Sequence, residues 1–292
     1  MPKISVISPV YNSAEFLPKL LDCLLNQTLS DIEIIFVDDC SPDNSSDIIK
    51  KYNDPRIKLF RHDVNKYIGQ ARNTGIKHAT GEYLYFIDPD DWIEYDFLEK
   101  LYTIAKNNNA DIAKGVYKLE PGGKVISMNG MIAKNKFNFH FTLWTAIYKK
   151  AMIDKYNIRF KLDVICGQLP MIYYANKIVT REDAIYHYVQ RPSSVINSGF
   201  TIEKWQRLNI TNTKIILDFI NNHEFNVNDY ILITRKLLFK LYTYGYLRLS
   251  SDEKIKAKPL LNKYLDECWN NLKYKNNKKL IRTYNELRSK YA

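Results

Sequence analysis

Residues 82–91 read EYLYFIDPDD, an apolar run that ends in three carboxylates around a proline. A short, continuous apolar run bounded by turn residues is typical of a strand buried on both faces of a sheet. We therefore expect a strand over Glu82–Ile87, with Asp88, Asp90 and Asp91 just beyond its carboxyl end. A parallel sheet gathers such ends at one edge, where ligands bind.

The chain before this junction repeats the same design. Apolar runs predict further strands at Ile4–Val10, Ile32–Val37 and Arg56–Phe60. Between the strands, apolar residues recur at helical spacing, and a helix over Gln70–Ala79 is expected to end at Gly81. Strands that alternate with helices form a parallel, doubly wound sheet with helices on both faces. The predicted fold class is therefore α/β.

The pattern changes after residue 110. A hairpin is expected over residues 111–128, and helices over Lys150–Tyr156 and Leu169–Asn176. Beyond residue 201 the spacing is helical, beginning with a helix over Ile202–Asn222. The sequence therefore predicts an α/β domain over residues 1–200 and a helical appendage over residues 201–292.

The composition is that of a folded protein with a sizeable core. Of the 292 residues 46% are hydrophobic, and there are only 10 glycines and 10 prolines, which excludes collagen-like and wholly disordered chains. The net charge is +11, and residues 201–292 hold 18 basic against 9 acidic side chains. Such a region suits an anionic partner, namely a phospholipid leaflet, a polyphosphate or a nucleic acid, or is simply a solvated basic face.

The cysteines and the longest apolar runs bear on cellular location. Cys23, Cys40, Cys166 and Cys268 are widely scattered, and the lack of CxxC spacing argues against zinc and thioredoxin-type chemistry. Scattered cysteines that need no disulfide are consistent with a protein in the reducing cytosol. No stretch reaches the roughly 18 apolar residues that a membrane span needs. We expect a cytoplasmic protein, or one that is peripheral on the inner face of the membrane.

The carboxylates after the fourth predicted strand suit a metal ion. Asp88 and Asp90 are two residues apart, so both can face a divalent ion that bridges phosphate oxygens. Oxygen ligands favour Mg2+ or Mn2+. The alternative is that Asp90 or Asp91 caps the next turn.

The end of the second predicted strand carries Asp38 and Asp39. They form either a polar turn or a site that bonds a base imide or a ribose hydroxyl, and Tyr11 is placed to stack on a planar base. The sequence has neither GxGxxG nor GxxxxGK[ST], which argues against a dinucleotide dehydrogenase and a P-loop NTPase.

Six segments, in order along the chain, resemble the inverting family 2 glycosyltransferases. They are ISVISPVYN (4–12), NQT (26–28), EIIFVDD (33–39), ARNTG (71–75), ATGEY (79–83) and FIDPDDW (86–92). Residues 144–195 are similar through YK (148–149), NIRF (157–160) and YHYVQRPSS (186–194). The resemblance implies a GT-A fold, a nucleotide-sugar donor that is most often a UDP-sugar, a Mn2+ or Mg2+ ion, and direct displacement with inversion.

The resemblance also assigns roles to residues of this chain. The nucleotide-sugar-binding set would be Pro9, Tyr11, Asp39, Arg72, Asp88 and Arg191. Within it, Pro9 and Tyr11 would flank the base, and Asp39 would bond the uracil imide with Arg72 close by. Arg191 would either pair with the diphosphate or be a surface arginine.

The metal site implied by the resemblance is made of Asp90 and Asp88. Asp88 would also hold the ribose, and Asp91 would be a catalytic support beside the pair. Residues 1–110 would then be the nucleotide-binding half of a catalytic domain over 1–200, and residues 111–200 the acceptor-binding half.

Inverting transfer also needs a base that takes the proton of the acceptor hydroxyl. In the family this base is the Asp of an acidic motif, which aligns here with residues 167–169, where Gln168 cannot act as a base. We expect Asp163, five residues earlier, to be the catalytic base. Asp91 or His187 are the alternatives, and an impaired or slow enzyme is a third explanation.

The tail suggests where such an enzyme works. Basic and aromatic residues interleave over 235–248, and a second basic run spans 273–282. We expect attachment to an anionic leaflet that carries a lipid-linked glycan acceptor; a subdomain that packs on the core, or a homodimer interface, are the alternatives. The predicted function is transfer of a sugar to a hydroxyl of a glycan in cell-surface polysaccharide or lipooligosaccharide synthesis.

Two other functions compete with this prediction. A non-catalytic nucleotide-sugar-binding protein on the same fold would explain Gln168. A nucleic-acid-binding protein would explain the basic charge and the many tyrosines. The near-neutral first 200 residues and the carboxylate cluster, which repels phosphate unless a metal intervenes, argue against nucleic acid.

Overall fold

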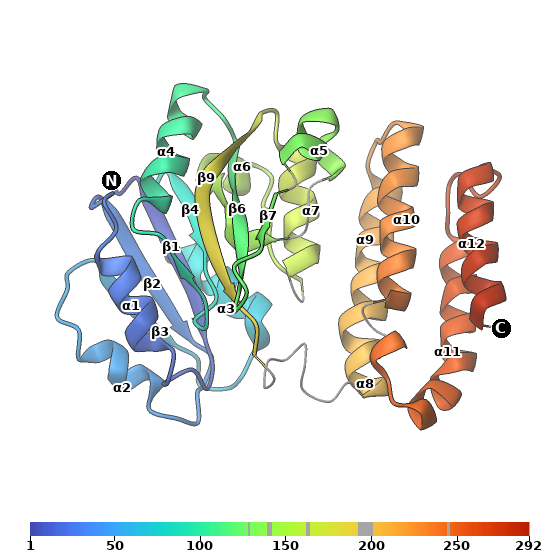
Figure 1. Ribbon diagram of the computed structural model, residues 1–292, viewed down its shortest axis with the longest axis horizontal. Coiled ribbons are helices and arrows are strands. Elements are labelled where there is room, and N and C mark those ends of the chain that lie inside the picture. Colours follow the sequence, from blue (N-terminus) through green and yellow to red (C-terminus); the bar gives the residue numbers. More distant parts are fainter. Residues whose placement is uncertain (128, 139–141, 162–163, 192–200, 244–245, 292) are drawn as a thin grey trace. The chain divides into compact units, whose positions relative to one another are not determined.

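The computed structural model describes residues 1–127, 129–138, 142–161, 164–191, 201–243 and 246–291. The chain divides into two compact units, Met1–Gln190 and Arg191–Ala292 (Figure 1). The functional division into a catalytic domain with two halves stays a prediction.

The first unit is built on one sheet of nine strands. They are β1 (Ile4–Val10), β2 (Ile32–Asp38), β3 (Ile57–Arg61), β4 (Tyr83–Phe86), β5 (Trp92–Ile93), β6 (Ile112–Glu120), β7 (Val125–Ile126), β8 (Ala146–Lys149) and β9 (Ile178–Val189). The order across the sheet is β3-β2-β1-β4-β8-β6-β9-β5, with β7 beside β6. β1 to β4 pair in parallel and confirm the parallel sheet predicted for the first 110 residues. β8 and β5 run antiparallel to their neighbours, so the later half of the sheet is mixed.

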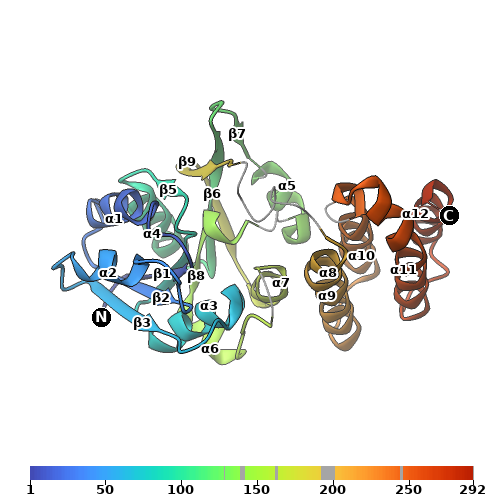
Figure 2. The ribbon, with the colours of Figure 1, turned by 90° about the horizontal axis from the view of Figure 1, so that it is seen from below.

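Helices cover both faces of this sheet, as predicted. They are α1 (Leu17–Leu25), α2 (Ser45–Lys50), α3 (Tyr67–His78), α4 (Phe97–Asn107), α5 (Asn129–Lys134), α6 (Lys150–Lys155) and α7 (Val164–Tyr174). Side chains of β1 alternate between the faces: Val6 and Val10 join the apolar core that includes α1 and α4, whereas Ile7 faces α3. Figure 2 shows α1 and α4 on one face of the sheet and α3 on the other. A Cβ atom on Gly75 of α3 would lie 2.3 Å from Ile7 Cγ2, so glycine is what lets α3 lie this close to β1.

Two local predictions are corrected. α3 ends at His78 with Ala79 in an extended conformation, so Gly81 does not terminate the helix. Instead, a Cβ atom on Gly81 would lie 2.5 Å from Ser5 N, and the glycine allows close approach to β1. α7 begins at Val164, five residues before the predicted start at Leu169. The predicted hairpin over 111–128 is confirmed by the antiparallel pair β6 and β7.

A buried carboxylate locks the strands around β1. Glu33 of β2 accepts hydrogen bonds from Ser5 Oγ at 2.5 Å, Thr80 N–H at 2.6 Å and Lys58 Nζ at 2.6 Å. Burial opposes its ionisation, but these donors outweigh burial and lower the pKa of Glu33 to about 2. The carboxylate therefore joins β1, β2, β3 and the turn before β4.

The strand order fixes where a ligand can enter. β2 lies beside β1, and β3 lies beside β2, so the first three strands follow one another in one direction across the sheet. α3 then connects β3 to β4, which lies on the other side of β1. Such a reversal leaves a crevice beyond the carboxyl ends of the two strands that flank it. In this chain the rule places the crevice beyond β1 and β4, next to the residues that follow them.

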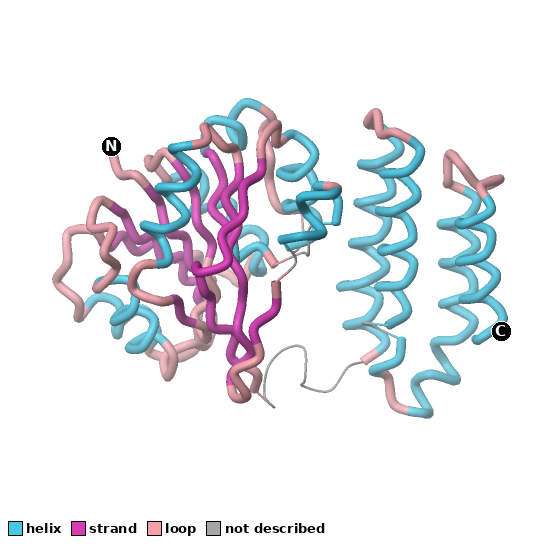
Figure 3. The backbone as a smooth tube through the Cα atoms, turned by 45° about the horizontal axis from the view of Figure 1, so that its top comes forward, coloured by secondary structure: helices cyan, strands magenta, loops and turns pink. Residues whose placement is uncertain are grey.

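The second unit is helical, as predicted. Its helices are α8 (Ile202–Trp205), α9 (Thr211–Asn222), α10 (Val227–Thr243), α11 (Ser251–Asn270) and α12 (Lys278–Tyr291), the longer ones side by side (Figure 3). A π-helical turn at Gln206–Ile210 interrupts the single helix expected over 202–222. Ser250 and Glu253 form a capping box that starts α11. Within the described residues, no helix is both long and apolar enough to cross a membrane.

Candidate functional site

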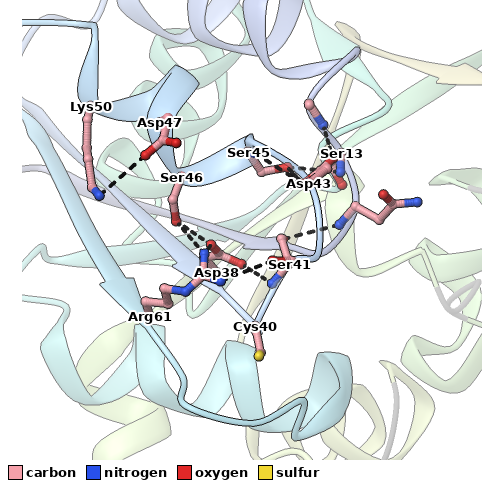
Figure 4. A network of polar contacts seen from close by, with 12 residues as sticks. Ser13, Asp38, Cys40, Ser41, Asp43, Ser45, Ser46, Asp47, Lys50 and Arg61 are labelled. Atoms are coloured by element: carbon pink, nitrogen blue, oxygen red, sulfur yellow. Dashed lines mark hydrogen bonds and ion pairs between the residues drawn. The ribbon is translucent and has the colours of Figure 1, made fainter.

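The loops after β1 and β2 are tied together at the crevice (Figure 4). The backbone N–H of Asn12 donates to Ser41 Oγ at 3.2 Å, and the N–H of Ala14 donates to Asp43 Oδ2 at 2.9 Å. Tyr11 precedes this network and is half exposed. The ring is therefore accessible beside the strand ends, and its stacking on a base stays a prediction.

Asp38 and Asp39 have different surroundings. Asp38 is fully buried and accepts from the N–H of Ser41 at 2.7 Å, while its other oxygen contacts Ser46 and Arg61 (Figure 4). These partners satisfy the carboxylate within the loop. Asp38 therefore serves the polar-turn role that the sequence left open, and Asp39 is the one available for a ligand.

Asp39 is held from one side only. Its Oδ1 lies 2.6 Å from His62 Nδ1 and accepts from the N–H of Lys66 at 2.8 Å. His62 Nε2 in turn lies 2.9 Å from Thr74 Oγ1 on α3. No hydrogen bond to Asp39 Oδ2 is found within the described part of the chain. His62 was missed by sequence reasoning; its signal is that it lies two residues after the third predicted strand, Arg56–Phe60.

Arg72 brings a buried positive charge to the crevice. It lies on α3 with 1% of its surface exposed, and Nη2 donates to Asp88 Oδ1 at 2.8 Å. Its Nε and Nη1 have no hydrogen-bond partner among the described residues. A buried donor without a partner costs about 1–3 kcal/mol. The guanidinium is therefore suited to a ligand that brings hydrogen-bond acceptors.

The three carboxylates after β4 divide into two groups. Asp88 and Asp90 are partly exposed, whereas Asp91 is buried. Asp91 accepts from Tyr186 Oη at 2.5 Å and from the N–H of Val189 at 2.7 Å. Burial raises the pKa of Asp91 well above its usual value, and the charge of Asp90 adds to this. This geometry favours a supporting role for Asp91 that ties β9 to the crevice, and does not favour its role as the base.

A divalent ion fits the remaining pair. Within the described residues, no group of three or more histidine, cysteine or acidic side chains is gathered that could hold a metal. Mg2+ and its relatives commonly take only one or two protein carboxylates and complete their shell with substrate phosphates and water. Asp88 and Asp90 suit that kind of site.

The position aligned with the acidic motif carries a core amide. Gln168 on α7 is fully buried, and its Nε2 donates to Tyr148 Oη at 2.8 Å. Its Oε1 has no hydrogen-bond partner among the described residues. Asp163, the predicted base, lies outside the described residues.

A side chain that sequence reasoning did not single out fixes the segment before Asp163. Asn73 Nδ2 donates to the carbonyl of Phe160, and the N–H of Phe160 donates to Asn73 Oδ1, both at 2.8 Å. The Phe160 ring then lies 5.6 Å from the guanidinium carbon of Arg72. The segments ARNTG and NIRF, which are 87 residues apart at Asn73 and Phe160, are thus joined beside the crevice.

Two further candidates lie elsewhere. His187 is buried, stacks on Trp92 with 3.4 Å between ring centroids, and has Nδ1 2.9 Å from Glu120 Oε1. It is therefore a packed histidine. Arg191 begins the second compact unit, and its contact with a diphosphate stays a prediction.

The comparisons with known proteins agree with this geometry. Residues 5–164 match the family described as Glycosyl transferase family 2. The chain belongs to this family. It is 31% identical over 218 residues to the uncharacterized glycosyltransferase EpsJ of Bacillus subtilis, and the aligned region covers 67% of this chain and 63% of EpsJ. It is 38% identical over 176 residues to the poly(ribitol-phosphate) beta-N-acetylglucosaminyltransferase TarP of Staphylococcus aureus, and the aligned region covers 55% of this chain and 53% of TarP.

The fold also matches solved structures. The structure of S. aureus TarS residues 1–349 in complex with UDP-GlcNAc covers 99% of this chain and 91% of that one, with a TM-score of 0.75 and 22% identity. This match confirms the predicted GT-A-type α/β fold with a helical C-terminal part. The chain spans less than two thirds of the length of EpsJ and TarP.

Proposed function

We propose that the chain is an inverting, metal-dependent glycosyltransferase that moves a sugar from a UDP-sugar to a hydroxyl of a cell-surface glycan. The observation that carries the proposal is the buried guanidinium of Arg72, bonded to Asp88 and left with two unpartnered donors at the crevice. Membership of the family supports the reaction class. The complexes of TarS with UDP-GlcNAc and with UDP support the choice of donor.

In this proposal the chain binds the donor through the strand ends. Tyr11 covers the base, and the outward oxygen of Asp39 accepts its imide proton while His62 holds the other oxygen. Arg72 and Asp88 receive the sugar-phosphate part. Asp88 and Asp90 would hold the Mn2+ or Mg2+ ion, which neutralises charge on the diphosphate. A mannosyltransferase of Pyrobaculum calidifontis with a TM-score of 0.59 was solved with GDP-Man and Mn2+, which is consistent with this type of site.

The base that we propose is Asp163. It follows Phe160 by three residues, and Phe160 is held next to Arg72 by Asn73. Gln168 offers no proton acceptor of comparable strength. Asp163→Asn should lower turnover about a hundredfold or more and leave UDP affinity unchanged, because proton transfer commonly contributes that much. Near-normal turnover of this variant would exclude Asp163 as the base, and Gln168→Glu is the matched control at the aligned position.

The experiment that tests the proposed function is a donor screen. The purified chain is incubated with Mn2+ or Mg2+ and a panel of UDP-, GDP- and CMP-sugars, and both thermal stabilisation and nucleotide release are measured. We expect metal-dependent stabilisation by a UDP-sugar and slow release of UDP. No stabilisation by any nucleotide sugar would contradict the proposal.

A second function is favoured by one observation. The amide of Gln168 stands where the family carries its acidic motif, and it is bonded into the core by Tyr148. A nucleotide-sugar-binding protein without transfer would show this feature. It would give stabilisation by a UDP-sugar with no nucleotide release, even when glycan acceptors are added.

For the cellular setting, we propose attachment to an anionic membrane surface through the second unit. The basic side chains Lys273, Lys275, Lys278, Lys279 and Arg282 are all exposed at the α11–α12 connection and the start of α12. Anionic lipid attracts such clusters by about 1 kcal/mol per basic residue. Flotation with vesicles should show salt-sensitive binding that requires phosphatidylserine. Equal flotation with neutral vesicles would contradict this attachment.

A further inference from the structure

Three partly exposed aromatic side chains, Tyr117, Trp144 and Tyr188, lie together in the first unit and are called here the Trp144 platform. The indole of Trp144 stacks on Tyr188 with 5.4 Å between ring centroids and planes 1° apart, and Tyr117 meets it edge-on at 5.1 Å. The buried ring of Tyr186 stacks on the same indole at 4.2 Å. All three rings pack against the apolar core of the first unit and still keep part of their surface exposed, so the cluster offers aromatic surface to a ligand.

The strand register puts this platform at the edge of the sheet that holds the crevice. β4 and β8 run antiparallel, with Tyr85 opposite Ile147. Asp88 lies three residues after Tyr85, and Trp144 lies three residues before Ile147, so both leave the ladder at the same end. Trp144, just before β8, thus lies beside the end of β4 that leads to Asp88 and Asp90.

A hydrogen bond connects the platform to the carboxylates. Tyr186, which stacks on Trp144, donates its hydroxyl to Asp91 at 2.5 Å. Asp91 adjoins Asp90 in the chain. The ring of Tyr186 therefore contacts both the indole and Asp91, and it holds the indole in a fixed orientation relative to the carboxylates at which sugar transfer is proposed to occur.

The chemistry of the platform selects a class of acceptor. The face of an aromatic ring carries partial negative charge and attracts polarised C–H groups, and the flat side of a cyclic sugar presents several of these in one plane. An open-chain polyol phosphate offers no rigid face of this kind, and its charge has no partner among the three rings.

We infer that the Trp144 platform binds a sugar ring of the acceptor, so that the acceptor ends in a cyclic sugar and not in an open-chain polyol phosphate. This inference rests on the proposed function and extends it to the acceptor. The donor also contains a sugar ring, so the test must separate the two sources.

The first arm uses tryptophan fluorescence and needs no turnover. The full chain, saturated with UDP and Mn2+, is titrated with methyl glucoside, methyl galactoside, methyl N-acetylglucosaminide and ribitol 5-phosphate. Trp144→Phe is compared with native protein and with Trp269→Phe, a matched control whose indole stacks on Tyr284 at 4.5 Å in the second unit. We expect a glycoside to change the emission of native protein and Trp269→Phe but not of Trp144→Phe, and ribitol 5-phosphate to change none.

The second arm uses Trp144→Ala in transfer assays with a donor found in the screen. We expect KM for a glycoside acceptor to rise about tenfold, which corresponds to the loss of one stacking contact. UDP affinity and the KM of acceptor-free donor hydrolysis should change less than twofold. If Trp144→Ala does not fold, the fluorescence arm with Trp144→Phe decides.

Three results would overturn the inference. They are the absence of any Trp144-dependent response to the glycosides, an equal or larger response to ribitol 5-phosphate, and a rise in donor KM in place of acceptor KM, which would assign the platform to the donor sugar. Failure of the proposed function looks different, because no nucleotide sugar would then stabilise the protein, whereas the glycoside titration repeated without UDP and Mn2+ would still report on Trp144.

Discussion

Replacing Arg72 by methionine should separate stability from binding. In the unliganded chain the substitution removes two buried donor nitrogens, Nε and Nη1, that lack partners among the described residues, and each such group costs about 1–3 kcal/mol. It also removes the bond to Asp88, which is worth about 1.5–3 kcal/mol as a charged hydrogen bond. These effects oppose each other, and methionine can still pack on Phe160. The free energy of unfolding should therefore fall by no more than about 1 kcal/mol, which is the largest loss from the bond less the smallest relief from the two donors.

Donor binding should respond very differently to the same change. If the ligand satisfies the two free donors of Arg72, the variant loses two charge-assisted bonds, or about 3 kcal/mol or more. UDP should then bind at least about a hundredfold more weakly. Urea unfolding and calorimetric titration of UDP with Mn2+ measure the two quantities.

The matched control for this test is Arg56→Met. Arg56 is partly buried and bonds Asp54 and the carbonyl of Leu25 at the amino end of β3. This variant should lose stability and keep its UDP affinity. The reasoning about Arg72 is refuted if Arg72→Met unfolds more than about 2 kcal/mol more easily and still binds UDP within threefold of the native protein.

Three other substitutions test the surroundings of the site. His62→Phe removes the side-chain partner of Asp39 Oδ1 and leaves the N–H of Lys66, so calorimetry should show UDP bound about tenfold more weakly and a smaller preference for UDP over CDP. An unchanged preference would mean that His62 only packs. Glu33 has its pKa lowered to about 2, so the native protein should lose about 2–3 kcal/mol of stability as pH falls from about 4.5 toward 2. Urea unfolding of Glu33→Gln should lack this loss, and the same acid loss in both proteins would contradict the assignment. Burial lowers the pKa of Lys114 to about 7. Above that pH the unfolded chain still holds the proton that the folded chain has lost, so native stability should rise by up to about 1.4 kcal/mol per pH unit between about pH 7 and 9 relative to Lys114→Met. Parallel pH curves for the two proteins would show that Lys114 stays charged when folded.

The first 110 residues could be predicted in some detail because each strand there is a continuous apolar run with a polar end. The parallel pairing of β1 to β4 and the crevice beyond them follow from that alternation. The helices of the second unit were predicted from their apolar spacing, whereas the π-helical turn at Gln206–Ile210 has no such signal.

Features that depend on distant contacts could not be predicted. Nothing local in the sequence links Asn73 to Phe160, 87 residues later, or tells that His62 holds Asp39. The sequence predicts this helix over Leu169–Asn176 only. In the structure α7 begins at Val164, and its Gln168 is buried and bonded to Tyr148, a residue 20 positions away in the sequence.

Metal-dependent binding of UDP tests the central claim most directly. UDP is titrated calorimetrically into the native chain and into Asp90→Asn, each with Mn2+ and with EDTA. The account predicts that Mn2+ tightens binding to the native protein at least tenfold and that Asp90→Asn loses this gain, because the variant keeps only Asp88 of the proposed metal-binding pair. Equal affinity with Mn2+ and EDTA, or an Asp90→Asn variant that keeps the full metal effect, would contradict the account.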